Sequence, residues 1–215
     1  MTRAGHPVAL RAEATRQEAL RYLGYPEGHP RALGAAALLD AEWDAAVALV
    51  QPRGAFALVD GEAAAAAGMP APAARVGVGV CTIGPALEAE SARRVAAGEL
   101  LPALLLDAIG SAAAEAAADA LNLEVCHAAL AQGLRAAPRV SPGYGTWETA
   151  AQRDLLALLP IAALGIALTE GGMMVPRKSV SFAASLLEPG ALAHEGGSPC
   201  RHCGLERCRH RREVP

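Results

Sequence analysis

The clearest strand signal in the chain is the segment Arg75-Val76-Gly77-Val78-Gly79-Val80-Cys81-Thr82. Valine alternates with glycine or cysteine, and this period of two is typical of a β-strand with distinct faces. Glycines on one face of a strand mark a close approach by another backbone or by a ligand. We interpret this glycine face as the place where a helix packs tightly against the sheet.

Around this segment the pattern predicts helices and strands in blocks rather than in strict alternation. Helices are expected at 7–23, 31–50, 86–97, 101–120 with a continuation toward 134, and 147–159 behind an N-cap at Thr146. Strands are expected at 55–59, 166–169, 173–175 and 179–187. This order favours an α+β fold with a mostly antiparallel sheet and alanine-rich helices. We expect one domain at 1–190 and a Cys/Arg-rich tail at 191–215.

Composition excludes several classes of protein. The 215 residues include 19 basic and 22 acidic side chains, a net charge of −3, which argues against a nucleic-acid partner. With 53% hydrophobic and 19% charged residues, disorder over most of the chain is excluded. The bases are nearly all arginine, and Lys178 is the single lysine.

No membrane span is expected. The longest apolar stretch, Leu155 to Leu168, is shorter than the roughly 20 residues that a bilayer helix needs, and it contains Pro160 and Gly165. The N-terminus lacks the apolar core of a secretory signal, and the five cysteines do not form a distributed disulfide framework. A cytoplasmic location is therefore expected.

A loop at 139–144 is the first candidate binding site. It reads Arg139-Val140-Ser141-Pro142-Gly143-Tyr144, in which the proline and glycine favour a fixed turn. An arginine can pair with a carboxylate through two hydrogen bonds, and a tyrosine supplies a flat face and a hydroxyl. Such a loop could hold a ligand that resembles an amino acid, or it could be an ordinary surface turn.

Glu115 and Asp119 lie four residues apart on the alanine-rich helix and share a face. The neighbouring sequence supplies no base to compensate them. They are either a solvated face or a pair of acids that recognises a cation or a ribose hydroxyl.

Several short motifs, taken in order, resemble the activation domain of cobalamin-dependent methionine synthase. They are the Arg139-x-x-Pro-Gly-Tyr144 loop, Thr169-Glu170, Met174, Pro176 and Ser179-Val180-Ser181. Asp107 and Glu115 also fall where that family has a pair of acids on its long helix. The resemblance extends over 104–181, about a third of the chain, and it implies a curved antiparallel sheet.

The resemblance implies binding of S-adenosylmethionine. In that family an Arg-x-x-x-Gly-Tyr loop holds the ligand, which here places Arg139 on the ligand carboxylate, with the backbone of Ser141 beside it. Gly143 and Tyr144 would close the turn, and Glu115 would face the charged amino-acid portion. After Ser181 the family has a strand with a tyrosine pair that also touches the ligand, whereas this chain continues Phe-Ala-Ala-Ser.

The implied function is to reactivate an oxidised corrinoid by reductive remethylation, with S-adenosylmethionine as methyl donor. The corrinoid would belong to a separate methionine synthase or corrinoid methyltransferase, and a flavodoxin-like protein would supply the electron. Whether such a component, acting in trans, counts as an enzyme by itself is left open. A conventional small-molecule methyltransferase ranks last, because no glycine-rich loop opens a helix behind a strand.

The tail carries a second candidate site. Its potential ligands are Cys200, Cys203, Cys208 and either His210 or His202. Thiolates with imidazole suit zinc, and three cysteines could also hold an iron–sulfur cluster with an outside ligand. Free or disulfide-linked thiols are the third possibility. The alternative function is therefore a metal-bearing interaction or electron-transfer module that kept the fold without binding the ligand.

Overall fold

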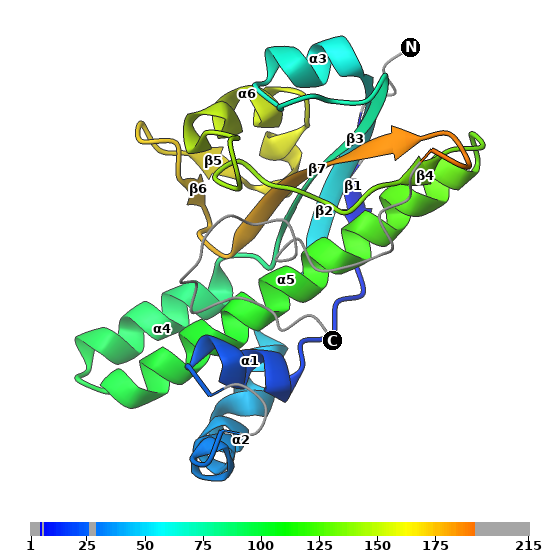
Figure 1. Ribbon diagram of the computed structural model, residues 1–215. Coiled ribbons are helices and arrows are strands. Elements are labelled where there is room, and N and C mark those ends of the chain that lie inside the picture. The colour runs from blue at the N-terminus through cyan, green and yellow to red at the C-terminus, as the bar shows by residue number, and fades with distance from the viewer. Residues whose placement is uncertain (1–4, 6, 26–28, 192–215) are drawn as a thin grey trace.

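An antiparallel sheet of five strands organises the protein, in the order β1-β2-β3-β7-β4 (Figure 1). The strands are β1 (Pro7–Ala9), β2 (Arg53–Asp60), β3 (Arg75–Thr82), β7 (Ser179–Leu187) and β4 (Arg135–Ala136). The central β3 pairs along its whole length with β2 and with β7. A separate pair joins β5 (Ala167–Leu168) to β6 (Met174–Val175). The structure is a computed structural model and describes residue 5 and residues 7–25 and 29–191.

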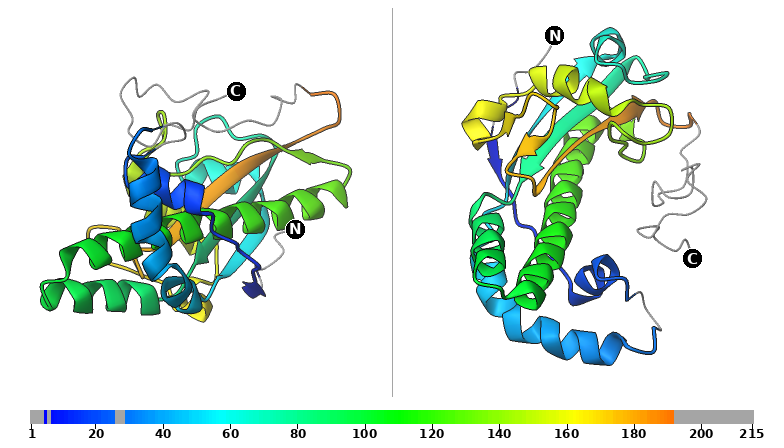
Figure 2. Two further views of the ribbon diagram at one scale, coloured as in Figure 1. Left: turned by 90° about the horizontal axis from the view of Figure 1, so that it is seen from below. Right: turned by 90° about the vertical axis from the view of Figure 1, so that its left-hand side faces the viewer.

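Helices cover both faces of the sheet. On one face lies α5 (Leu100–Leu130), which continues past the sheet to pack with α1 (Arg16–Tyr22), α2 (Ala32–Ala48) and α4 (Ala86–Ala96) (Figure 2). The other face carries α3 (Gly61–Ala66), α6 (Gln152–Ala157) and the 3-10 helices η1 (Thr149–Ala151) and η2 (Ile161–Leu164). The predicted α+β fold with an antiparallel sheet and alanine-rich helices is confirmed.

The glycines of β3 explain how α5 reaches the sheet. A Cβ added at Gly77 would lie 2.3 Å from Cγ1 of Val125 on α5. A Cβ added at Gly79 would lie 2.6 Å from Cζ of Phe182, which is fully buried on β7. The glycine face is therefore filled by a helix and by a neighbouring aromatic ring, as the alternation of residues 75–82 predicts.

The helix predicted at 7–23 is wrong over its first half. Pro7–Ala9 forms an edge strand that pairs with Arg53–Ala55, where a proline is tolerated. The helix begins only at Arg16, behind Thr15, whose hydroxyl accepts a hydrogen bond from the backbone N–H of Glu18 at 3.2 Å. Thr15-x-x-Glu18 is a capping-box sequence, so the true start had a local signal.

The helix predicted at 147–159 also begins later than expected, and Thr146 is not its N-cap. The backbone of Trp147 is engaged in the preceding turn: its N–H donates to Tyr144 and its carbonyl accepts from Gly143. Trp147 is 2% exposed, and its indole N–H donates a hydrogen bond to the carbonyl of Ala67 at 3.4 Å. The chain therefore enters η1 at Thr149 and α6 at Gln152.

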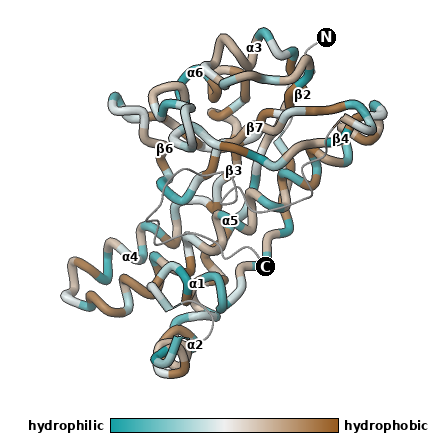
Figure 3. The backbone as a smooth tube through the Cα atoms, in the orientation of Figure 1, coloured by the Kyte–Doolittle hydropathy of each residue, from teal (hydrophilic) through white to brown (hydrophobic). Residues whose placement is uncertain are grey.

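Of the described helices, α5 is long and apolar enough to cross a membrane by length and composition alone. The sequence pattern had not predicted such a helix. In its most apolar window 56% of the residues are buried inside the protein, against the sheet and against α1, α2 and α4. This packing accounts for its apolar character. Large hydrophobic side chains remain exposed at the end where α4 meets α5, including Val95, Leu100 and Leu104. Figure 3 shows hydrophobic stretches, in brown, along α4 and α5. The cytoplasmic location stays a prediction.

Candidate functional site

A β-bulge on the edge of the sheet positions Arg139. Beyond β4, the N–H of Ala137 donates to Ser185 at 2.8 Å, and Val140 then pairs with Ala183. Pro138 and Arg139 together therefore stand opposite the single residue Ala184. A proline lacks the N–H that a regular ladder would use, and a bulge changes the direction of a side chain. The bulge turns Arg139 toward α5.

Arg139 contacts both acids of the sequence-predicted pair, which lie on α5. Its Nη2 donates to Oε2 of Glu115 at 2.6 Å and to Oδ1 of Asp119 at 2.9 Å, while its Nε donates to the same Oδ1 at 3.2 Å. The guanidinium carbon lies 5.9 Å from the centre of the Phe182 ring. The absence of a compensating base, inferred from the neighbouring sequence, is therefore wrong, because the base comes from 20 residues beyond Asp119.

The three charges differ in burial. The side chains of Arg139 and Glu115 are 12% and 23% exposed, whereas that of Asp119 is 55% exposed. Burial by itself lowers the pKa of Arg139, but attraction by Glu115 and Asp119 outweighs it, and the pKa lies above its ordinary value. Arg139 is therefore cationic throughout the physiological range. Close by, burial raises the pKa of the Cys81 thiol to about 12, so this thiol is neutral.

The loop after the bulge is fixed by its own backbone. Tyr144 donates to the carbonyl of Ser141 at 3.1 Å, and Gly143 donates to that of Trp147 at 2.7 Å. Gly143 has a φ of +95°, and a Cβ there would also lie 3.1 Å from Oγ1 of Thr149. A glycine is thus required at this position, as the loop motif predicts.

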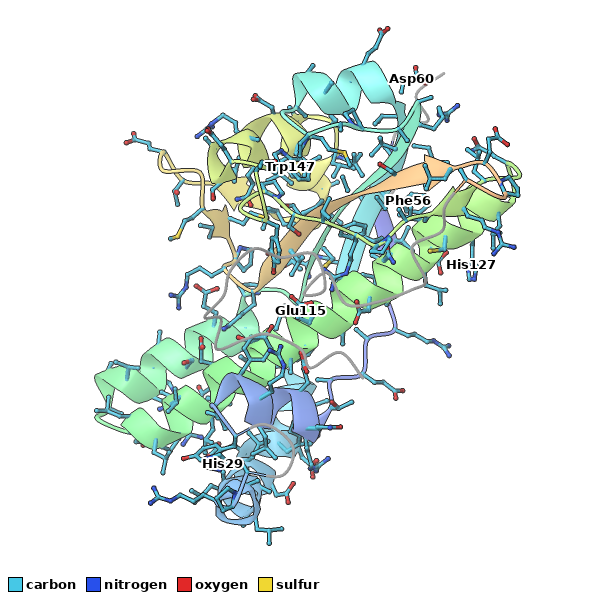
Figure 4. All side chains as sticks on the ribbon, in the orientation of Figure 1. His29, Phe56, Asp60, Glu115, His127 and Trp147 are labelled. Carbon is cyan, nitrogen blue, oxygen red and sulfur yellow. The ribbon has the colours of Figure 1, made fainter. Side chains whose placement is uncertain are left out.

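Tyr144 does not lie beside Arg139. It lines an apolar pocket of about 310 Å³ on the opposite face of the sheet from α5. The pocket walls include Met69, Pro138, Val140, Tyr144, Trp147 and Ser185. Figure 4 shows Glu115 midway along α5 and Trp147 near α3 and α6. The predicted site residues therefore fall into two groups on opposite faces of the sheet: Arg139 with Glu115 on the α5 face, and Tyr144 with the pocket on the other face.

Lys178 is a polar residue of this region that was not predicted to belong to a site. Its Nζ donates to Oγ of Ser111 at 2.8 Å and pairs with Oδ1 of Asp107 at 2.8 Å. Ser111 lies one helical turn before Glu115, so a polar row follows one side of α5. The available signal was that a chain rich in arginine has a single lysine.

The predicted metal ligands Cys200, Cys203, Cys208 and His210, with His202 as the alternative, lie outside the described residues. Within residues 5, 7–25 and 29–191, no three or more His, Cys, Asp or Glu side chains are grouped so that they could hold a metal ion. Zinc or an iron–sulfur cluster at the tail stays a prediction.

The sheet and its helices define an α+β domain in which one long helix crosses a curved antiparallel sheet. Among solved structures, this fold is that of the MetH reactivation domain, in a crystal structure bound to AdoHcy. The TM-score is 0.60 over 85% of this chain and 78% of that chain, with 16% sequence identity. The predicted resemblance in fold is confirmed. No family model and no curated protein matches the chain.

Proposed function

We propose that the protein binds S-adenosylmethionine and acts as a reactivation component for a corrinoid held by another polypeptide. The observation that carries the proposal is the ion pair between Arg139 and Glu115. The bulge at the sheet edge directs Arg139 toward Glu115 on α5. The solved domain with this fold is bound to AdoHcy, which supports a related adenosyl ligand here.

The chemistry of the ion pair fits the amino-acid end of such a ligand. That end carries one carboxylate and one ammonium group. A guanidinium offers parallel N–H groups to a carboxylate, and charge-assisted bonds of this kind are the stronger hydrogen bonds of proteins. Arg139 would take the ligand carboxylate, and Glu115 would accept hydrogen bonds from the ammonium group. Both side chains are largely shielded from water, which strengthens these contacts.

The apolar pocket suits the nucleoside end. Pockets that bind small molecules are mostly apolar with a few polar groups, and aromatic side chains provide flat surfaces for a base. Tyr144, which is 46% exposed, supplies such a surface, and the Ser185 side chain supplies a polar group. In this proposal the ligand crosses the edge segment near Val140 and Ser141, with its sulfonium between the two groups of residues. Phe182, in the region of the family's tyrosine pair, lies beneath Arg139 and does not line this pocket.

The corrinoid would supply the reaction itself: a flavodoxin-like donor would provide one electron, the ligand would provide the methyl group for the cobalt, and S-adenosylhomocysteine would be released. The residues of this chain would bind the methyl donor, orient it and shield its charged end from water. The partner would be a methionine synthase or another corrinoid methyltransferase.

Calorimetric titration with S-adenosylmethionine tests the proposal. We expect saturable binding at one site, and Arg139→Ala should weaken it about 10- to 150-fold, which corresponds to 1.5–3 kcal/mol for a charge-assisted bond. Arg21→Ala is the matched control. Arg21 pairs with Glu18 at 2.6 Å, and the two side chains are 14% and 23% exposed, which nearly equals the values of the proposed site. Equal affinity in wild type and Arg139→Ala would refute the assignment.

A further inference from the structure

Asp119 contacts one of the edges of the Arg139 guanidinium through which a ligand carboxylate could pair. Its Oδ1 accepts from both Nε and Nη2, at 3.2 and 2.9 Å. These two atoms form one of the edges of the guanidinium that pair with a carboxylate through parallel hydrogen bonds. Glu115 shares only Nη2, at 2.6 Å. Oδ1 of Asp119 therefore occupies this edge of the guanidinium.

The two acids differ in how far their side chains are exposed to water. Glu115 is 23% exposed and lies deeper, whereas Asp119 is 55% exposed. An ion pair with an exposed carboxylate contributes little free energy, because water solvates the carboxylate well when it is released. Exchange of Asp119 for another carboxylate would thus be cheap, while removal of Glu115 from Arg139 would not.

Arg139 itself is fixed from several sides. The bulge sets its backbone, the Phe182 ring lies beneath the guanidinium at 5.9 Å, and Glu115 anchors Nη2. A carboxylate that pairs with the Nε–Nη2 edge of this fixed guanidinium must therefore take the position of Asp119.

We propose that Asp119 is an internal competitor for the ligand carboxylate and so sets the affinity and the carboxylate selectivity of the site. This inference rests on the proposed function. It assigns the two acids opposite roles: Glu115 contributes to ligand binding, and Asp119 opposes it.

The test is calorimetric titration of Asp119→Asn with S-adenosylmethionine and with its decarboxylated analogue. The variant should bind S-adenosylmethionine about two- to fivefold more tightly, the gain expected when an exposed ion pair no longer competes. It should bind the decarboxylated analogue no more tightly than wild type does, because that ligand displaces no carboxylate.

Glu124→Gln is the control for a general charge effect, because it removes one negative charge five residues further along α5. It should leave both affinities unchanged. Glu115→Gln should weaken binding of both ligands, since both retain the ammonium group.

The outcomes separate the two proposals. If wild type binds neither ligand, the proposed function fails and this inference fails with it. If wild type binds S-adenosylmethionine but Asp119→Asn binds it equally or more weakly, only the role of Asp119 is overturned. An equal gain in Glu124→Gln would replace competition with a long-range charge effect and would also overturn it.

Discussion

Two Arg–Glu pairs in this protein have the same shortest distance and similar burial but different origins. Arg21 and Glu18 lie three residues apart on α1, with a shortest distance of 2.6 Å. Arg139 and Glu115 have the same shortest distance, yet one comes from a bulge on the sheet edge and the other from α5. The first pair follows from the helix period alone, because residues three apart on a helix are neighbours. The second depends on the arrangement of the sheet edge and α5, and it is the pair to which we assign the proposed ligand site.

The largest expected effect on stability concerns the contact that places α5 on the sheet. Gly77→Ala brings a Cβ to within 2.3 Å of Val125, and this overpacking should lower the free energy of unfolding by about 1–3 kcal/mol in urea titrations. It should also weaken ligand binding, because Glu115 moves with α5. Gly34→Ala on the exposed side of α2 meets no atom within 4 Å and should be neutral or slightly stabilising. Equal stability of the two variants would contradict the close packing of β3 and α5.

A smaller difference is expected between the two arginines. Arg139→Ala removes the 2.6 Å partner of Glu115, whose side chain is only 23% exposed, and should lower the free energy of unfolding by about 1–3 kcal/mol. Arg21→Ala removes a pair within one helix, so the expected loss is about 0.2–0.5 kcal/mol. Urea denaturation of both variants measures the difference. If Arg21→Ala were the more destabilised, the long-range pair would not be the one that ties α5 to the sheet edge.

Local patterns account for the parts of the fold that were predicted correctly. Residues 179–187 and 75–82 are strands with the predicted bounds, because hydrophobic alternation and flanking turn residues are local signals. The start of α1 at Arg16 was missed, although the capping sequence after Thr15 announces it. The late start of α6 was not predictable in the same way, because it depends on the burial of Trp147 beneath α3.

For the candidate site, the sequence predicted the residues but not the contacts between them. The loop motif and the acid on α5 identified Arg139 and Glu115, but their contact joins segments 24 residues apart through a bulge. The role of Asp119 at the guanidinium and the contact of Lys178 with Ser111 have no local signal, since each depends on how α5 lies across β7. Tyr144 is separated from Arg139 because Arg139 faces α5, whereas Tyr144 lines the pocket on the other face of the sheet.

The most direct test of the account compares the carboxylate preference of three proteins. Wild type, Arg139→Ala and Arg21→Ala would each be titrated with S-adenosylmethionine and with decarboxylated S-adenosylmethionine. We expect wild type and Arg21→Ala to prefer the carboxylate-bearing ligand by about tenfold or more, and Arg139→Ala to lose this preference. If Arg139→Ala kept the preference of wild type, the ligand carboxylate would bind elsewhere, and the central claim would be wrong.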